Sequence, residues 1–278
     1  MPNCFHKVSI KSRPNPQIGK KGLFMHLRFI QARVKADNIH RLRAVYEEKI
    51  IPAMQGVDGC LYIGLFHNIR HPDECISLSF WSDRKKIDSY EKSGVFTILL
   101  NTSKPYFDDS SEWQMNLSDD LTLTYTQLPQ EAVVKDFAIT SPDQKPLISD
   151  KTFFVRVVSH QVRTGMEEDF RRIYNNEVLS SLTQISGCRS AYLTENPEDK
   201  GKLFSITIWD SQGDADKYEQ SGLFNTLLDK LKPTLSGVYQ WKMRLERETG
   251  AQVRTTDDIT VEGYSMLTGK SFQSKGAI

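Results

Sequence analysis

Polar and aromatic residues that could bind a small molecule and move its protons occur twice in the chain, in the same order and 128 positions apart. Arg28 and Arg156 each carry a guanidinium, which can hold an anion through paired hydrogen bonds. His26 lies beside Arg28 and could act as a general base, whereas its counterpart in the second set is Phe154. The other candidates carry hydroxyl or aromatic groups that can contact an aromatic ring, namely Ser77, Ser79, Trp81 and Tyr90 in the first set and Ser205, Thr207, Trp209 and Tyr218 in the second.

These two sets belong to a long internal repeat. Residues 24–115 align with residues 152–243 without a gap, and 22 of the 92 positions are identical. A repeat of this length exceeds the 20–50 residues of a solenoid unit, so we expect each copy to be a small domain.

The apolar periodicity predicts the order strand, helix, strand, strand, helix, strand in each copy. Phe24–Ile30 and Cys75–Trp81 alternate as strands, and the latter has Ser77, Ser79 and Trp81 on one face. Apolar residues at steps of three and four from Ile39 to Ala53 predict a helix, in a stripe that includes Tyr46. The last strand of the first copy is expected around Trp113–Leu117.

The repeat and the predicted order of elements divide the chain into five segments. They are a flexible basic leader (1–22), a first ferredoxin-like domain (23–117), a linker (118–151), a second ferredoxin-like domain (152–245) and a C-terminal extension (246–278).

Two helices cover only one face of a four-stranded sheet, so the other face of each sheet must be covered by another part of the protein. We expect the helices to take the strongly apolar face of each sheet. The faces with Arg28 and Arg156 then turn toward each other, and the two domains close an intramolecular, pseudo-dimeric α+β barrel. Because small hydroxyl side chains fill space poorly, this polar interior should keep a cavity.

The strand that ends in Trp81, the helix with Tyr90 and the following Ser93-Gly94-Val95-Phe96 resemble the antibiotic-biosynthesis monooxygenase family of dimeric α+β barrels. The resemblance covers roughly 24–117 and 152–245, so one chain would supply both halves of the barrel. It identifies the fold better than the activity, since such folds host many functions.

The resemblance implies a cofactor-independent monooxygenase that oxidises small phenolic or quinol-type aromatics with molecular oxygen. It implies neither a metal nor an organic cofactor. Trp81 and Tyr90 would stand in the pocket as catalytic residues with His26 and Arg28. The second set, together with Ser77 and Ser79, would bind the substrate. The haem-degrading members of the superfamily need an axial histidine where this chain has leucines such as Leu99 and Leu227.

The same residues could have structural roles instead of catalytic or binding ones. The two tryptophans could plug the barrel, and Tyr90 and Tyr218 could pack in a core. The arginines could pair with carboxylates, and His26 could be a satisfied structural histidine. The alternative function is therefore a non-catalytic small-molecule-binding or scaffold protein, for which the long linker and C-terminal extension would be docking segments.

Composition excludes several other classes. The net charge of +1 does not favour a nucleic-acid partner, and no apolar run is long enough for a membrane span or a secretory signal. The four cysteines form neither a disulfide framework nor a zinc motif, which favours a cytoplasmic protein. The expected partner is a small aromatic ligand, and two chains could associate as a homodimer of pseudo-dimers.

Overall fold

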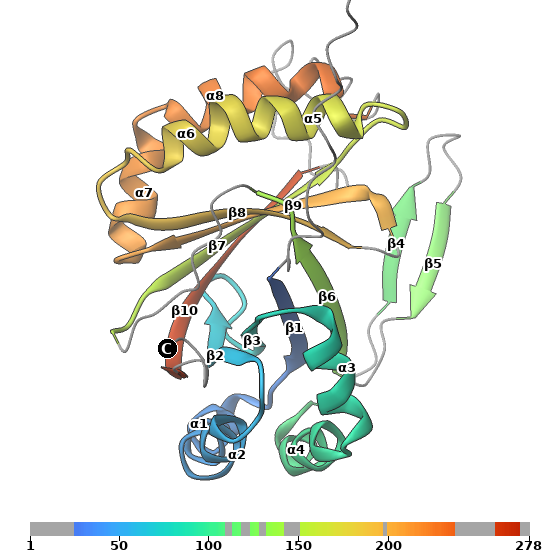
Figure 1. Ribbon diagram of the computed structural model, residues 1–278, viewed down its shortest axis with the longest axis vertical. Coiled ribbons are helices and arrows are strands. Elements are labelled where there is room, and N and C mark those ends of the chain that lie inside the picture. Colours follow the sequence, from blue (N-terminus) through green and yellow to red (C-terminus); the bar gives the residue numbers. More distant parts are fainter. Residues whose placement is uncertain are drawn as a thin grey trace, which may run out of the picture.

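Eight strands form one closed barrel with helices packed on opposite sides, as a computed structural model shows (Figure 1). The structure describes residues 25–108, 113–117, 123–127, 132–141, 151–196, 199–236 and 259–272. The expected leader 1–22 lies outside this range. The predicted α+β fold of two ferredoxin-like repeats closing one barrel is confirmed.

The barrel consists of two four-stranded sheets joined edge to edge. The order around it is β1-β3-β2-β10-β7-β9-β8-β6, and every neighbouring pair is antiparallel. The first sheet comprises β6 (Val133–Ile139), β1 (His26–Arg33), β3 (Glu74–Trp81) and β2 (Cys60–Asn68). The second comprises β10 (Ile259–Ser271), β7 (Phe154–Gln161), β9 (Asp199–Trp209) and β8 (Cys188–Asn196).

Each half carries its own helices. In the first half these are α1 (Ile39–Val45), the π-helical segment η2 (Tyr46–Ile50), α2 (Ile51–Gln55), α3 (Arg84–Lys92) and α4 (Val95–Ser103). In the second half they are α5 (Glu167–Ile173), the π-helical segment η4 (Tyr174–Val178), α6 (Leu179–Leu182), α7 (Gln212–Gln220) and α8 (Leu223–Leu231). Short 3-10 turns lie at η1 (Ala36–Asn38), η3 (Lys104–Tyr106) and η5 (Lys232–Thr234). Figure 1 shows the two helical layers at opposite ends of the molecule, with the barrel between them.

Helix boundaries follow local chemistry. The Asp83 side chain accepts a hydrogen bond from the Lys86 backbone nitrogen and so caps α3. Gly94 separates α3 from α4 with φ of 78°, a left-handed conformation that glycine adopts without strain. Gly222 repeats this break between α7 and α8 with φ of 77°. The repeat therefore conserves its turn chemistry as well as its core.

The barrel interior is apolar, so the predicted orientation of the two sheet faces is wrong. Leu27, Leu78 and Phe80 of the first half meet Tyr192 and Ile206 of the second in one core cluster inside the barrel. The faces that carry the two candidate sets lie instead under the helices of their own half, and these faces bear Arg28, Ser77, Ser79 and Trp81 in the first and Arg156, Ser205, Thr207 and Trp209 in the second.

Hydrogen-bonding demand explains this inversion. The interior is filled by aromatic contacts such as Phe80–Tyr192 and Phe137–Phe204, with ring centroids 5.6 and 4.7 Å apart. It offers few partners to a hydroxyl or a guanidinium, and burying such groups without partners is costly. Glu91 on α3 supplies a partner on the helical side of the sheet.

The fourth strand of each sheet also differs from the prediction. The strand β4 (Trp113–Leu117) exists, but it pairs with β5 (Leu123–Gln127) in a separate hairpin. The strand beside β1 is β6, from the expected linker, and the strand beside β7 is β10, from the expected C-terminal extension. The second-copy strand expected around Trp241 lies outside the described residues. Linker and extension therefore complete the barrel, because β6 also pairs with β8 and β10 with β2.

Among the described residues, no helix has both the length and the apolar character needed to cross a membrane.

Candidate functional site

A cavity lies between the sheet of the first half and its helices. It encloses about 40 Å³ of water-accessible space, which is room for a few water molecules at about 10–15 Å³ each. Most of its wall is apolar, from Ile30 on β1 to Phe96 and Leu100 on α4. The protic side chains in the wall are Tyr46, Cys75, Ser77, Tyr90 and Ser103.

The π-helical segment η2 positions the first of these groups. Tyr46 opens η2, is 6% exposed and hydrogen-bonds Ser77 on β3. Burial raises the pKa of Tyr46 above its ordinary value, so the phenol stays protonated and can donate a hydrogen bond. Sequence reasoning placed Tyr46 only in an apolar helix stripe. The signal available was the recurrence of this Tyr–Ser pair as Tyr174 and Ser205.

Tyr90 reaches the same cavity from α3. Its ring lies 5.2 Å from the Trp81 ring and 5.8 Å from the Phe96 ring, measured between centroids. Among the described residues its hydroxyl has no hydrogen-bond partner, and burial raises the pKa of Tyr90. Tyr90 and Ser77 are thus the predicted site residues that line this cavity.

Trp81 and Ser79 lie beside the cavity rather than in its wall. The Trp81 indole nitrogen donates to the Ser79 hydroxyl at 2.9 Å, and both residues are buried. The second half repeats the arrangement, with Trp209 donating to Thr207 at 2.8 Å and packing 5.3 Å from Tyr218. In each pair the indole N–H is satisfied by the neighbouring hydroxyl. Both pairs therefore pack behind the residues that line the cavities.

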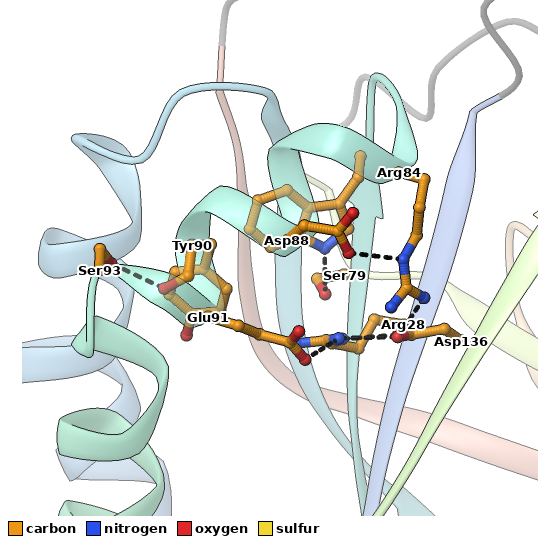
Figure 2. Close-up of polar contacts among 9 residues, drawn as sticks. Arg28, Ser79, Arg84, Asp88, Tyr90, Glu91, Ser93 and Asp136 are labelled. Carbon is orange, nitrogen blue, oxygen red and sulfur yellow. Dashed lines mark hydrogen bonds and ion pairs between the residues drawn. The ribbon is translucent and has the colours of Figure 1, made fainter.

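Arg28 lies in a network of carboxylates (Figure 2). Its Nε and Nη2 atoms donate to Asp136 on β6 at 2.6 and 2.7 Å, and Nη2 also donates to Glu91 on α3 at 2.5 Å. Arg28 is 1% exposed and lies 5.2 Å from the Phe96 ring centroid. Burial lowers its pKa, but the bonds to Asp136 and Glu91 outweigh burial and raise it. Only Nη1 has no partner among the described residues.

We expect Asp136→Ala to destabilise the protein by about 2–4 kcal/mol, because it leaves the buried Arg28 with Glu91 alone. Asp88→Ala is the matched control, since Asp88 pairs with Arg84 at the surface and such pairs contribute less than about 1 kcal/mol. Urea unfolding of both variants measures the difference. Equal losses would show that Arg28 does not depend on Asp136.

His26, like Arg28 and Trp81, is a predicted catalytic residue that does not line the cavity. It opens β1, pairs with Trp81 across the sheet and is half-buried. The wall formed by β1 begins at Ile30, farther along the strand. The predicted base therefore does not line this cavity, and among its described lining residues there is no aspartate, glutamate or histidine. Burial raises the pKa of the Cys75 thiol to about 12, so it supplies no base either.

A second cavity occupies the equivalent place in the second half, with about 30 Å³ of water-accessible space. Tyr174 opens η4 and its hydroxyl lies 2.5 Å from that of Ser205. Tyr218, the counterpart of Tyr90, is absent from the described lining. His160 lines it instead.

Among the described residues, the second arginine has fewer carboxylate partners than the first. Arg156 donates to Glu219 at 3.0 Å and lies 4.3 Å from the Phe224 ring centroid, but Gly263 is its neighbour on β10, where Arg28 has Asp136 on β6. Burial accordingly lowers the pKa of Arg156. Neither arginine belongs to the described lining of its cavity.

Metal ligands do not gather in the part of the chain that the structure describes, where no three His, Cys, Asp or Glu side chains lie close enough to hold an ion.

The fold is similar to several solved structures. A candidate monooxygenase from Fusobacterium nucleatum matches with a TM-score of 0.62 and 13% identity, over 92% of this chain and 96% of that one. A candidate monooxygenase from Lactobacillus acidophilus matches with a TM-score of 0.58 and 12% identity, over 89% and 96%. An anthrone oxidase-like protein matches with a TM-score of 0.55 and 8% identity, over 93% and 98%. At these identities the similarity shows the fold.

No curated protein matches the chain in sequence. The family described as antibiotic biosynthesis monooxygenase matches residues 25–98 and again residues 153–229. These two segments hold three strands of each four-stranded sheet, most of the helices and most of the cavity-lining residues, and they cover more than half of the chain. The protein therefore belongs to the antibiotic biosynthesis monooxygenase family and carries two copies of its domain.

Proposed function

We propose that the protein binds a small phenolic or quinol-type aromatic in the first-half cavity and oxidises it with molecular oxygen, without a metal or a flavin. The observation that supports this most strongly is the Tyr46–Ser77 hydroxyl pair, which faces an otherwise largely apolar cavity in a member of this family. An aromatic ring would pack against the apolar wall with its hydroxyl toward the pair. Because the cavity as it stands holds only a few water molecules, the helices over it have to move apart to admit the ring.

The cavity offers hydrogen-bond donors to an oxyanion rather than a base. Tyr46, Ser77 and Tyr90 bring three hydroxyl groups to the wall. Donors fixed in a water-poor site stabilise negative charge where it develops. Because the described wall contains no carboxylate or imidazole, the substrate has to give up its phenolic proton readily by itself.

The reaction needs no external reductant. A phenol loses its O–H proton and the hydrogen on the para carbon, and that carbon gains a double-bonded oxygen atom from O₂. In a quinol both hydroxyls become carbonyls, and one ring C–H becomes C–OH with an oxygen atom from O₂. The other oxygen atom leaves as water. The ring supplies all four electrons that O₂ accepts, and the product is a quinone.

The test is oxygen consumption by purified, metal-free protein with quinols of different acidity. We expect rates above autoxidation that rise with pH, and an inflection that moves with the pKa of each substrate, because the substrate ionises and the cavity does not supply the base.

Two other results would count against this mechanism. An inflection fixed at one pH for all substrates would indicate a titrating protein group. Rates equal to autoxidation across the panel would remove the enzymatic function and favour the non-catalytic binding protein.

A further inference from the structure

The strands β6 and β9 each carry a lysine at the same end of the barrel interior. The two strands run in the same direction, because β8 lies antiparallel to both of them. Side chains alternate along a strand, so Lys135 shares the inward face of β6 with Phe137, and Lys202 shares that of β9 with Phe204. The Lys202 Nζ atom lies 5.9 Å from the Phe204 ring centroid, which is 4.7 Å from that of Phe137. The two lysines therefore flank one aromatic contact inside the barrel.

These lysines are half-buried, and neither has a carboxylate partner among the described residues. Burial lowers the pKa of Lys135, and the positive charge of Lys202 lowers it further. No described carboxylate opposes these two effects. Burying a charge is costly unless the charge is paired, so the two ammonium groups need a counter-anion that the described part of the chain does not supply.

The equivalent place in the repeat holds two glutamates instead of two lysines. Lys202 corresponds to Glu74 in the aligned repeat. Lys135 corresponds to Glu262, because each of them pairs with the same position of the first strand of a half, β1 or β7. The charge at both positions is therefore reversed between the two places.

Both glutamates have partners within the chain. Glu74 accepts a hydrogen bond from Arg33 at 3.2 Å, and Glu262 accepts one from Asn68 at 2.5 Å. Gln161 stands where the second copy would have an arginine equivalent to Arg33. The acidic place is thus satisfied internally, whereas the basic place is left to bind an anion from solution.

We propose that Lys135 and Lys202 together bind a small dianion with the charge and size of hydrogen phosphate. An ammonium group donates hydrogen bonds, and such bonds to an oxyanion are short and strong because both groups are charged. One dianion neutralises both ammonium groups, whereas a monoanion leaves one of them unpaired. This site is separate from the first-half cavity, which lies between the opposite face of the first sheet and its helices.

Thermal unfolding of the full-length protein in inorganic phosphate tests this, at a pH where phosphate is mainly the dianion. Potassium chloride at equal ionic strength controls for screening of charge. A ligand that binds only the folded state raises the midpoint of unfolding, so we expect phosphate to raise it beyond the value in chloride. Acetate, a monoanion, should bind about tenfold more weakly or worse, because it pairs with one ammonium group only.

The matched variants are Lys135→Met and Lys202→Met, each of which keeps an unbranched apolar stem and removes one charge. Each, if folded by circular dichroism, should lower the affinity for phosphate by about tenfold or more. Lys202→Arg should retain binding, because it keeps the charge and the N–H donors. Lys85→Met, at an exposed position of α3, removes a charge elsewhere and should leave the affinity unchanged.

Equal midpoints in phosphate and in chloride would overturn the proposal and would mean that the chain itself supplies the counter-charge. A phosphate effect that persists in both methionine variants would also overturn it, because the anion would then bind elsewhere. Neither readout depends on oxidation in the first half.

Discussion

Tyr46→Phe should lower kcat/KM for quinol oxidation by about 10²–10³-fold, the effect of removing one donor from a site that stabilises an oxyanion. The change deletes only the hydroxyl that hydrogen-bonds Ser77 and leaves the ring in the core. The loss should fall mainly on kcat, because the donor acts on charge that develops as the substrate is oxidised. Steady-state oxygen consumption at saturating and limiting substrate measures both constants.

Tyr62→Phe is the matched control. Tyr62 is a fully buried tyrosine of the same half, but it lies inside the barrel and its hydroxyl contacts the Met266 sulfur at 3.8 Å. Its substitution should leave kcat/KM within about twofold of the parent. An equal loss in Tyr174→Phe would contradict the assignment of oxidation to the first half.

Acid should destabilise the folded protein through His160. The pKa of this group is 6.5 in the unfolded chain and about 3 in the folded protein, because burial disfavours the imidazolium. The unfolded state therefore takes up the proton first as pH falls. The folding free energy contributed by the neutral ring is fully present above pH 6.5 and is lost between pH 6.5 and about 3.

The size of this effect follows from the same interval. Each pH unit in the window changes the free energy of unfolding by about 1.4 kcal/mol, or roughly 4–5 kcal/mol in total. Carboxylates also titrate there, so the quantity to compare is the difference between the parent and His160→Phe, measured by urea unfolding from pH 7 to pH 4. We expect the free energy of unfolding of His160→Phe to rise steadily relative to that of the parent as pH falls.

His40→Phe controls for the loss of a histidine as such, since His40 is exposed on α1. Its free energy of unfolding should stay parallel to that of the parent. If the His160→Phe curve also ran parallel, the imidazole would be hydrated in the folded state rather than buried and neutral.

The repeat and the alternation of β1 and β3 were sufficient to predict two ferredoxin-like halves in one barrel. They could not decide which face of each sheet turns inward, because both faces are buried and alternation alone is symmetric. The choice depends on partners from distant segments, such as Glu91 and Asp136 for Arg28. Sequence spacing does not reveal those contacts.

The strands that complete the two sheets were also beyond sequence reasoning. The aligned repeat ends near Met115 and Met243, so it predicts Trp113–Leu117 as the last strand of the first half. The strands β6 and β10 instead lie outside the aligned repeat. Their positions in the sheets are fixed by long-range pairing with β1 and β7. Such non-local pairing is the part of a β fold that local patterns specify least.

At the candidate site, sequence reasoning found Ser77 and Tyr90 but not Tyr46 or His160. Tyr46 occupies a regular core position of a helix. Two features distinguish it, the recurrence of Tyr46 and Ser77 as Tyr174 and Ser205 and the π-helical turn that begins at Tyr46, a feature often found at functional sites. In the sequence His160 is an ordinary strand residue, and it is distinguished only by having no hydrogen-bond partner among the described residues.

Quinol binding in the first-half cavity is tested most directly by a crystal structure of the protein with a quinol bound in the absence of oxygen. We predict the ring in the first-half cavity, between β3 and the helices, with its hydroxyl within hydrogen-bond distance of Tyr46 or Ser77. A ring bound inside the barrel, or a first-half cavity that stays empty at saturating quinol, would show that Tyr46 and Ser77 do not bind the substrate.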